Sequence, residues 1–219
     1  LGLMGFPGEV DHLPYDMVTL PDGAMSSRKG NIVRWTDMYD TMYANLVKET
    51  TARHPDWSTR KVASTAKTLA IASVKFVMLR QDPEKVLTFD MDEAMSAEGY
   101  TAPYVLYTVA RIHTLLNKAE IAPEQQAKLL THPLESSLLK MIAKLPDVVQ
   151  GAGATYRASA IAQYAFELSQ EFARYYEAVR ILDDNNHDRV AARLGLLDAV
   201  RQTLSNAMGT LGIEVLKEM

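Results

Sequence analysis

Residues 99–112 have the sequence Gly-Tyr-Thr-Ala-Pro-Tyr-Val-Leu-Tyr-Thr-Val-Ala-Arg-Ile and open the most clearly helical part of the chain. Pro103 suits the first turn of a helix, where its missing N–H costs no hydrogen bond. From there to Ala119, apolar residues recur at intervals of three and four and form one broad face. The segment therefore predicts a helix over residues 103–119 whose apolar face is buried against other helices.

Helical spacing also recurs through most of the remaining chain. Before residue 34, by contrast, Asp16 to Leu20 alternates and precedes the turn Pro21-Asp22-Gly23, which favours a strand and a turn in the only plausible strand region. The predicted fold class is mainly α: a helical bundle over residues 98–219, preceded over residues 1–97 by a short strand and loop and a helical connector. Further helices are predicted at residues 36–50, 58–81, 124–130, 133–145, 158–182 and 188–209.

Composition limits the classes of function. With 219 residues, 47% of them hydrophobic, the chain can bury a substantial core. Its net charge of -4 means that any nucleic-acid contact must come from a local basic or stacking patch. The absence of cysteine excludes disulfides and thiolate metal sites, and the five histidines show no metal-like pairing, so no metal ligand is predicted. No signal peptide or membrane-spanning run is evident, so we expect a cytoplasmic protein without membrane contact.

The most unusual local sequence is the loop Asp-Gly-Ala-Met-Ser-Ser-Arg-Lys-Gly-Asn at residues 22–31. Its glycines allow backbone amides to approach a ligand, its serines donate hydrogen bonds, and Arg28 and Lys29 can follow a pyrophosphate as negative charge grows. The loop therefore suits phosphate binding. The same composition also suits an ordinary solvated turn between a strand and a helix.

Three side chains on the helix predicted at residues 103–119 suit an unpaired RNA loop. Tyr104, Tyr107 and Arg111 lie at intervals of three and four, so they can share one face. Tyrosine rings can stack on bases, while a guanidinium one turn away can meet a phosphate or a base edge. The alternative is a core helix in which the tyrosines bury their rings, and Tyr104 suits that role.

The loop also carries a resemblance to a known family. Residues 25–31, Met-Ser-Ser-Arg-Lys-Gly-Asn, resemble the arginyl-tRNA synthetase version of the class I Lys-Met-Ser-Lys-Ser loop, which helps to activate the amino acid with ATP. The sequence departs from that pattern at Ala24, where the first lysine should stand, and at Ser27, which replaces the second, so Arg28 or Lys29 would supply the charge. The resemblance implies a catalytic role for Met25, Ser26, Ser27, Arg28 and Lys29, with Ser26, Arg28 and Lys29 at the phosphates of ATP, which the full-length enzyme uses with Mg²⁺.

Two later segments resemble the same family. Residues 99–112 resemble the start of its helical anticodon-binding domain, which implies that Tyr107 and Arg111 contact the anticodon loop. Residues 193–201, 211–214 and 218–219 resemble the last helices of that domain, which would place Met219 near the anticodon. Tyr176 is a further tRNA-binding candidate, although it belongs to an aromatic cluster with Phe172 and Tyr175 that also suits core filling.

The resemblance implies a C-terminal part of arginine–tRNA ligase, an enzyme that attaches arginine to its tRNA using ATP. No His-Ile-Gly-His-like motif and no repeated strand–helix units occur in the sequence, so we expect the isolated chain to bind tRNA(Arg) without catalysing the reaction and without a bound cofactor. ATP and arginine would meet the enzyme through its catalytic core, and a monomer is favoured. The alternatives are a stand-alone tRNA-binding or protein-interaction module derived from a synthetase, and a sister enzyme such as cysteinyl-tRNA synthetase.

Overall fold

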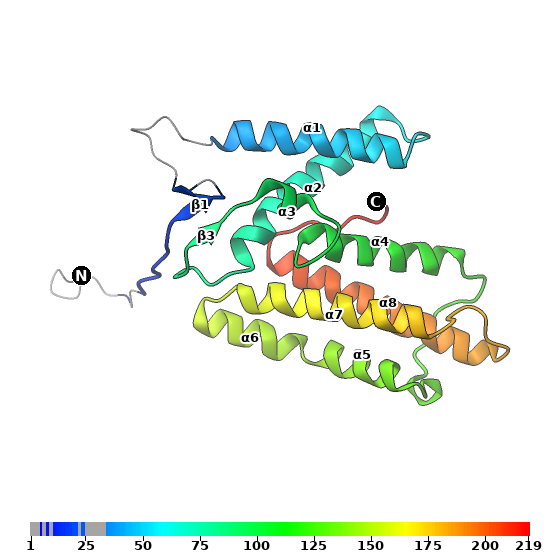
Figure 1. Ribbon diagram of the computed structural model, residues 1–219. Coiled ribbons are helices and arrows are strands. Elements are labelled where there is room, and N and C mark those ends of the chain that lie inside the picture. Colours follow the sequence, from blue (N-terminus) through cyan, green and yellow to red (C-terminus); the bar gives the residue numbers. More distant parts are fainter. Residues whose placement is uncertain (1–4, 6–7, 9–10, 22, 25–33) are drawn as a thin grey trace.

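The protein is described by a computed structural model that covers residues 5, 8, 11–21, 23–24 and 34–219. Figure 1 shows that most of the described chain is helical, with a small strand region on the N-terminal side. The helices are α1 (Trp35–Arg53), α2 (Thr59–Leu79), α3 (Met91–Met95), α4 (Ala102–Lys118), α5 (Pro133–Ala143), α6 (Leu145–Thr155), α7 (Ser159–Ala178) and α8 (His187–Thr210), with a 3-10 turn η3 (Ala127–Leu129). The predicted mainly α fold class is confirmed.

Three short strands form a small sheet in the order β2-β1-β3. The strand β1 (Val18–Leu20) pairs antiparallel with β2 (Gly23–Ala24) and parallel with β3 (Leu87–Thr88). The strand predicted before residue 34 is therefore confirmed, but the restriction of strands to that region is wrong. A two-residue strand is too short to show alternation, so β3 depends on its pairing with β1 rather than on a local signal.

The helices pack in two connected groups. Helices α1 and α2 form a hairpin, while α4, α5, α6, α7 and α8 form the bundle seen in the lower half of Figure 1. Helix α2 joins the groups because it packs on both α1 and α4, and one continuous cluster of buried side chains includes Met42, Phe76, Val105 and Leu168. The domain boundary placed between residues 97 and 98 stays a prediction.

Helix α4 begins and ends within one residue of the prediction. The side chain of Thr101 accepts a hydrogen bond from the backbone N–H of Tyr104, and Pro103 lies in the first turn. These two features explain the sharp start of the helix, since the cap satisfies an N–H that has no partner inside the helix. The prediction for residues 103–119 is thus confirmed.

The predicted helix at residues 124–130 is wrong, because only the 3-10 turn Ala127–Leu129 forms there. The chain instead crosses α8 at very close range. The N–H of Glu124 donates to the carbonyl of Ala191, at 2.9 Å, and a Cβ added to Gly195 would lie 2.1 Å from the Glu124 carbonyl oxygen. Backbone pairing with α8 therefore replaces the helix, and glycine at position 195 makes the close approach possible.

Two helices were not predicted, and one ends earlier than expected. Helix α6 begins at Leu145, where the predicted helix was expected to end, and it contains Pro146 in its first turn and two glycines. Helix α3 has only five residues and begins after Asp90, whose side chain accepts hydrogen bonds from two backbone N–H groups. Helix α7 ends at Ala178 rather than at Leu182.

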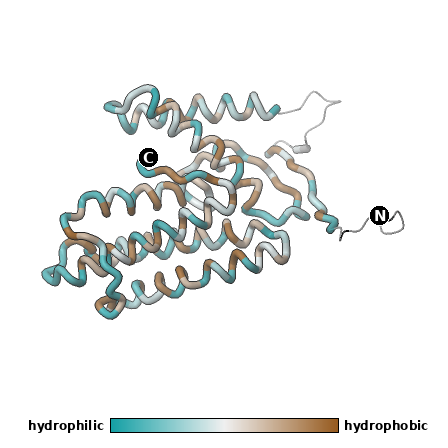
Figure 2. The backbone as a smooth tube through the Cα atoms, turned by 180° about the vertical axis from the view of Figure 1, so that it is seen from behind, coloured by the Kyte–Doolittle hydropathy of each residue, from teal (hydrophilic) through white to brown (hydrophobic). Residues whose placement is uncertain are grey.

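Helix α2 is long and apolar enough to cross a membrane by length and composition alone, but 56% of its most apolar stretch is buried inside the protein. Figure 2 shows hydrophobic residues along much of α2, whereas α1 is mostly neutral or hydrophilic. A core helix of a soluble protein passes the same test, so this single helix is weak support for a membrane span.

A buried polar cluster ties α5, α7 and α8 together. The carboxylate of Glu135 is fully buried and accepts hydrogen bonds from the Arg193 guanidinium at 2.8 Å and from the Tyr175 hydroxyl at 3.1 Å. Arg193 also donates a hydrogen bond to the Asp184 carboxylate at 2.9 Å, and Asp184 accepts a further hydrogen bond from Arg189. We call Glu135, Tyr175, Asp184, Arg189 and Arg193 the Glu135 cluster. Its members satisfy one another, as buried charges require.

Candidate nucleic-acid interface

One groove brings together side chains from four separate parts of the chain, and we call it the α4 groove. Its walls come from the turn between α1 and α2, from one face of α4, from the end of α7, and from the C-terminal segment. The lining residues are His54, Trp57, Tyr107, Ala110, Arg111, Thr114, Leu115, Lys118, Tyr176, Glu218 and Met219. All four residues predicted to bind tRNA, Tyr107, Arg111, Tyr176 and Met219, therefore line the same groove.

Arg111 contacts two exposed tyrosine rings in this groove. Its Nη2 donates to the hydroxyl of Tyr107 at 2.7 Å, and its guanidinium carbon lies 4.7 Å from the centre of the Tyr107 ring and 5.0 Å from that of Tyr176. Tyr107 is 39% exposed and Tyr176 38% exposed. Cation–π contacts of this kind hold the side chains in place while ring surface stays open to a ligand.

The two roles considered for the tyrosines of α4, RNA stacking and core packing, apply to different residues. Tyr104 is half-buried, and the centre of its ring lies 5.3 Å from the centre of the Phe166 ring on α7. The Tyr104 ring therefore packs between α4 and α7. Burial raises the pKa of the Tyr104 hydroxyl above its ordinary value. Tyr107, one turn further along, faces the groove instead. The core role thus applies to Tyr104, whereas Tyr107 does not bury its ring.

The aromatic cluster on α7 divides in the same way. Phe172 and Tyr175 are buried, whereas Tyr176 is exposed and contacts Arg111, a choice between the two tyrosines that the sequence left open. Successive residues on a helix point about 100° apart, so Tyr175 enters the core and Tyr176 enters the groove. The hydroxyl of Tyr175 has a strongly raised pKa because it is buried beside the Glu135 carboxylate.

The C-terminal segment is held over the groove by an ion pair. The Lys61 ammonium pairs with the Glu218 carboxylate and lies 3.9 Å above the centre of the Trp57 ring. Trp57 in turn stacks on His54, with ring centres 3.9 Å apart and an angle of 10° between the planes. The hydrogen bond and charge of Lys61 lower the pKa of Glu218. These contacts bring the last two residues to the rim of the groove.

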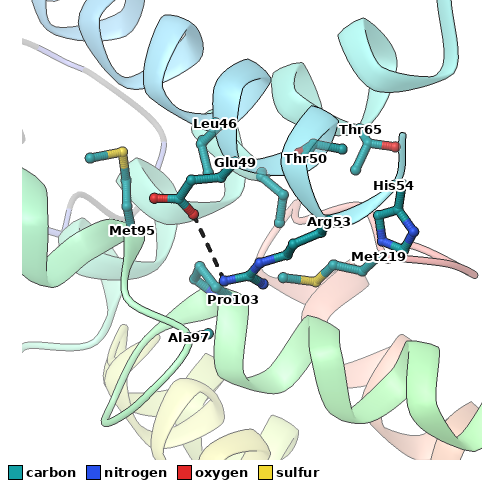
Figure 3. Close-up of a pocket in the computed structure, with 11 residues that line it drawn as sticks. Leu46, Glu49, Thr50, Arg53, His54, Thr65, Met95, Ala97, Pro103 and Met219 are labelled. Atoms are coloured by element: carbon teal, nitrogen blue, oxygen red, sulfur yellow. Dashed lines mark ion pairs between the residues drawn. The ribbon is translucent and has the colours of Figure 1, made fainter. Parts of the chain in front are cut away.

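Met219 also reaches a second, smaller cavity between α1, α2 and α4. Figure 3 shows its side chain directed toward Arg53 and Pro103, with His54 beside it. Leu46 and Leu69 contribute apolar lining to that cavity, and a Glu49–Arg53 ion pair with a 3.9 Å separation lies at its edge. Met219 therefore links the α4 groove to the α1–α2 hairpin, which gives the C-terminal segment an apolar anchor.

Sequence reasoning missed His54, Trp57, Lys61 and Lys118 as candidates. The first three lie in the segment assigned to the connector, at or next to the gap between the helices predicted at residues 36–50 and 58–81. The available signal was an aromatic pair and a cation within eight residues, at a turn between two helices. That signal gains meaning only when the fold brings the turn beside α4, more than 40 residues away in sequence.

The residues of the predicted catalytic loop are not among the described residues that line the groove. Met25, Ser26, Ser27, Arg28 and Lys29 lie outside the described residues, between β2 and the start of α1. Their roles stay predictions. In the part of the chain that the structure does describe, no group of three or more acidic or histidine side chains could hold a metal ion.

The charges and rings of the α4 groove suit a single-stranded nucleic acid. Arg111 and Lys118 are cations that line it, and the charge of Glu218 is offset by its pairing with Lys61. The rings of Tyr107, Tyr176 and Trp57 offer stacking surfaces to bases. Sequence-tolerant stacking next to a planar guanidinium is the chemistry by which proteins bind unpaired bases.

Comparisons with known proteins agree with this chemistry. Curated relatives include the arginine–tRNA ligase of Flavobacterium psychrophilum, 33% identical over 95% of this chain and 35% of the relative. The arginine–tRNA ligase of Methanocella arvoryzae is 35% identical over 94% of this chain and 36% of the relative. This chain spans about a third of the length of these relatives.

Solved structures show the same fold. The arginyl-tRNA synthetase of Thermus thermophilus matches 94% of this chain with a TM-score of 0.83 and 26% identity, over 35% of its own length. That of Plasmodium falciparum matches 94% with a TM-score of 0.78 and 20% identity, over 34% of its length, which supports the fold alone. The predicted resemblance is thus confirmed. Residues 105–219, more than half of the chain, match the DALR anticodon binding domain, and the chain therefore belongs to that family.

Proposed function

We propose that this chain is the C-terminal part of an arginine–tRNA ligase and that its α4 groove binds the anticodon loop of tRNA(Arg). The observation that carries the proposal is the meeting of Tyr107, Arg111, Tyr176 and Met219 in one groove from three separate segments. Helix spacing and the family resemblance singled out Tyr107 and Arg111 together. The same resemblance singled out Met219, and an aromatic cluster singled out Tyr176. Their convergence favours a shared ligand over three unrelated packing roles.

In this proposal the groove acts by stacking and by charge. Unpaired anticodon bases stack on the rings of Tyr107 and Tyr176, while the guanidinium of Arg111 meets a base edge or a phosphate. The Arg111–Tyr107 hydrogen bond and the two cation–π contacts hold these groups before the RNA arrives. A prearranged site loses less conformational entropy on binding.

The remaining roles follow from the whole enzyme. Met25, Ser26, Ser27, Arg28 and Lys29 would form the activation loop, in which Ser26, Arg28 and Lys29 meet ATP phosphates accompanied by Mg²⁺. Arginine and ATP would bind through the catalytic core, in the cytoplasm. The isolated chain would bind tRNA as a monomer and would form no arginyl-adenylate, and detection of that product with the isolated chain would contradict this part of the proposal.

A competition titration tests the anticodon role. The chain is titrated with tRNA(Arg) and with a tRNA changed only in its anticodon, at one fixed salt concentration. We expect the intact anticodon to bind more tightly and the preference to disappear in Arg111→Ala. The matched control is Arg201→Ala, because Arg201 lies on α8, pairs with Asp198 and does not line the groove. Equal binding of both tRNAs by the unchanged chain would favour a generic RNA-binding or protein-binding module instead.

A further inference from the structure

Helix α2 has a charge composition unlike that of the whole chain. The chain carries 27 acidic and 23 basic residues, yet α2 contains Arg60, Lys61, Lys67 and Lys75 and no aspartate or glutamate. An acidic protein that binds RNA needs a local basic surface. Helix α2 supplies such a concentration of cations outside the residues 105–219 that match the anticodon-binding domain.

These cations share one exposed side of the helix. Arg60, Lys67 and Lys75 follow intervals of seven and eight residues, which returns them to the same face, and all three are exposed. The hydroxyls of Ser64 and Thr68 lie among them, while the opposite face packs on α1 and α4. We call Arg60, Lys61, Ser64, Lys67, Thr68 and Lys75 the α2 cationic face.

The α2 cationic face starts at the rim of the α4 groove. Lys61 contacts both Trp57 and Glu218, which line that groove. Further along, Ser64, Lys67, Thr68 and Lys75 line a second groove against residues 212–214. Among its described lining residues, Glu214 is the only carboxylate. From Arg60 to Lys75 the helix advances about 22 Å at its normal rise, which is long enough to meet several phosphates of one strand.

We propose that the α2 cationic face binds the sugar–phosphate backbone of the RNA strand that leaves the α4 groove. The identity of that strand as part of a tRNA rests on the proposed function. Arg60 and Lys67 offer cationic donors and Ser64 and Thr68 offer hydroxyls, the groups that contact phosphate oxygens. Lys61 pairs with Glu218, and Lys75 donates to the carbonyl of Gly212. Such contacts position the RNA without reading its sequence, so the α2 cationic face adds affinity and the α4 groove adds selectivity.

A salt series on one double variant tests the proposal. Arg60→Gln/Lys67→Gln removes two cations that have no ion-pair partner among the described residues and do not line the α4 groove. The control is Lys140→Gln/Lys144→Gln, two exposed cations of the α5–α6 region. Affinities for tRNA(Arg) and for the anticodon-changed tRNA are measured between low and moderate salt.

We expect the test variant to weaken binding of both tRNAs by the same factor, and to reduce the slope of log K against log salt by about 1.5 to 2. The control should change neither quantity. An unchanged slope in the test variant, or an equal change in the control, would overturn the α2 assignment even if anticodon preference persists. If the unchanged chain shows no anticodon preference while the slope still falls, the α2 face stands and the anticodon function fails.

Discussion

Two tyrosine–arginine clusters in this bundle use the same side chains for opposite purposes. In the Glu135 cluster, Tyr175 and Arg193 converge on a fully buried carboxylate, and every charge has a partner. In the α4 groove, Tyr176 and Arg111 contact each other at the surface and leave ring area exposed. Tyr175 and Tyr176 are neighbours in sequence, so the difference arises from burial and pairing rather than from residue type.

The largest expected effect is on stability, from breaking the buried pair. Arg193→Met should leave the Glu135 carboxylate buried without its cation, which costs about 3–5 kcal/mol of the free energy of unfolding. Urea denaturation followed by circular dichroism measures it. The control Arg201→Met breaks a partly exposed pair and should cost less than about 1 kcal/mol. Equal losses in both variants would show that the Glu135 cluster is not a special structural element.

Arg111 should show the reverse behaviour. Arg111→Ala should weaken binding of tRNA(Arg) by about 1–3 kcal/mol, which corresponds to roughly a 5- to 150-fold increase in Kd. Its effect on unfolding should stay below about 1 kcal/mol, because the half-buried side chain contributes one hydrogen bond and two cation–π contacts rather than the cation of a buried ion pair. If Arg111→Ala loses stability instead of affinity, Arg111 serves the fold, as Arg193 does, and not RNA binding.

The adjacent tyrosines offer a sharper contrast, with a smaller effect on stability than that of Arg193→Met. Tyr175→Phe removes one hydrogen bond to a buried carboxylate and should destabilise the fold by about 1–2 kcal/mol. Tyr176→Phe retains the ring and should leave both stability and stacking nearly unchanged, whereas Tyr176→Ala should weaken RNA binding by about 1–3 kcal/mol. Unfolding and binding assays run in parallel on the three variants check these expectations. A destabilised Tyr176→Phe variant would contradict the assignment of Tyr175 to the core and of Tyr176 to the RNA-binding groove.

The smallest expected effect is a pH dependence. Hydrogen bonds from Arg189 and from the Asn186 backbone hold the pKa of Asp184 well below its usual range in the folded protein. A lowered folded-state pKa stabilises the fold above the unfolded-state pKa near 4, and this contribution is lost as the pH falls below it. Unfolding measured from pH 6 to pH 3 should therefore show less acid sensitivity in Asp184→Asn. An identical pH profile in both proteins would exclude Asp184 as a contributor.

The helices were the more predictable part of the molecule. The apolar periodicity at residues 103–119 and 188–209 is long and regular, and α4 and α8 follow it closely. Helix α6 was missed because its proline and glycines are typical of a loop. Residues 124–130 were misassigned because the backbone of Glu124 hydrogen-bonds to Ala191 of α8 and packs closely on Gly195. In both places tertiary packing decides against the local signal.

The candidate site was predictable only in part. Spacing placed Tyr104, Tyr107 and Arg111 on one face, but periodicity cannot tell which ring a neighbouring helix covers. In the structure, Phe166 of α7 covers the ring of Tyr104. The contribution of Trp57 was beyond local reasoning altogether, because it depends on the α1–α2 turn lying beside α4.

Photo-crosslinking locates the anticodon most directly. A tRNA(Arg) with one photoreactive base in its anticodon is bound to the unchanged chain, irradiated and digested, and the crosslinked peptides are identified by mass spectrometry. We expect crosslinks to residues of the α4 groove, chiefly on α4 between Tyr107 and Lys118, at Tyr176 and in the last two residues. Crosslinks confined to surfaces outside the groove would contradict the assignment of this groove to the anticodon.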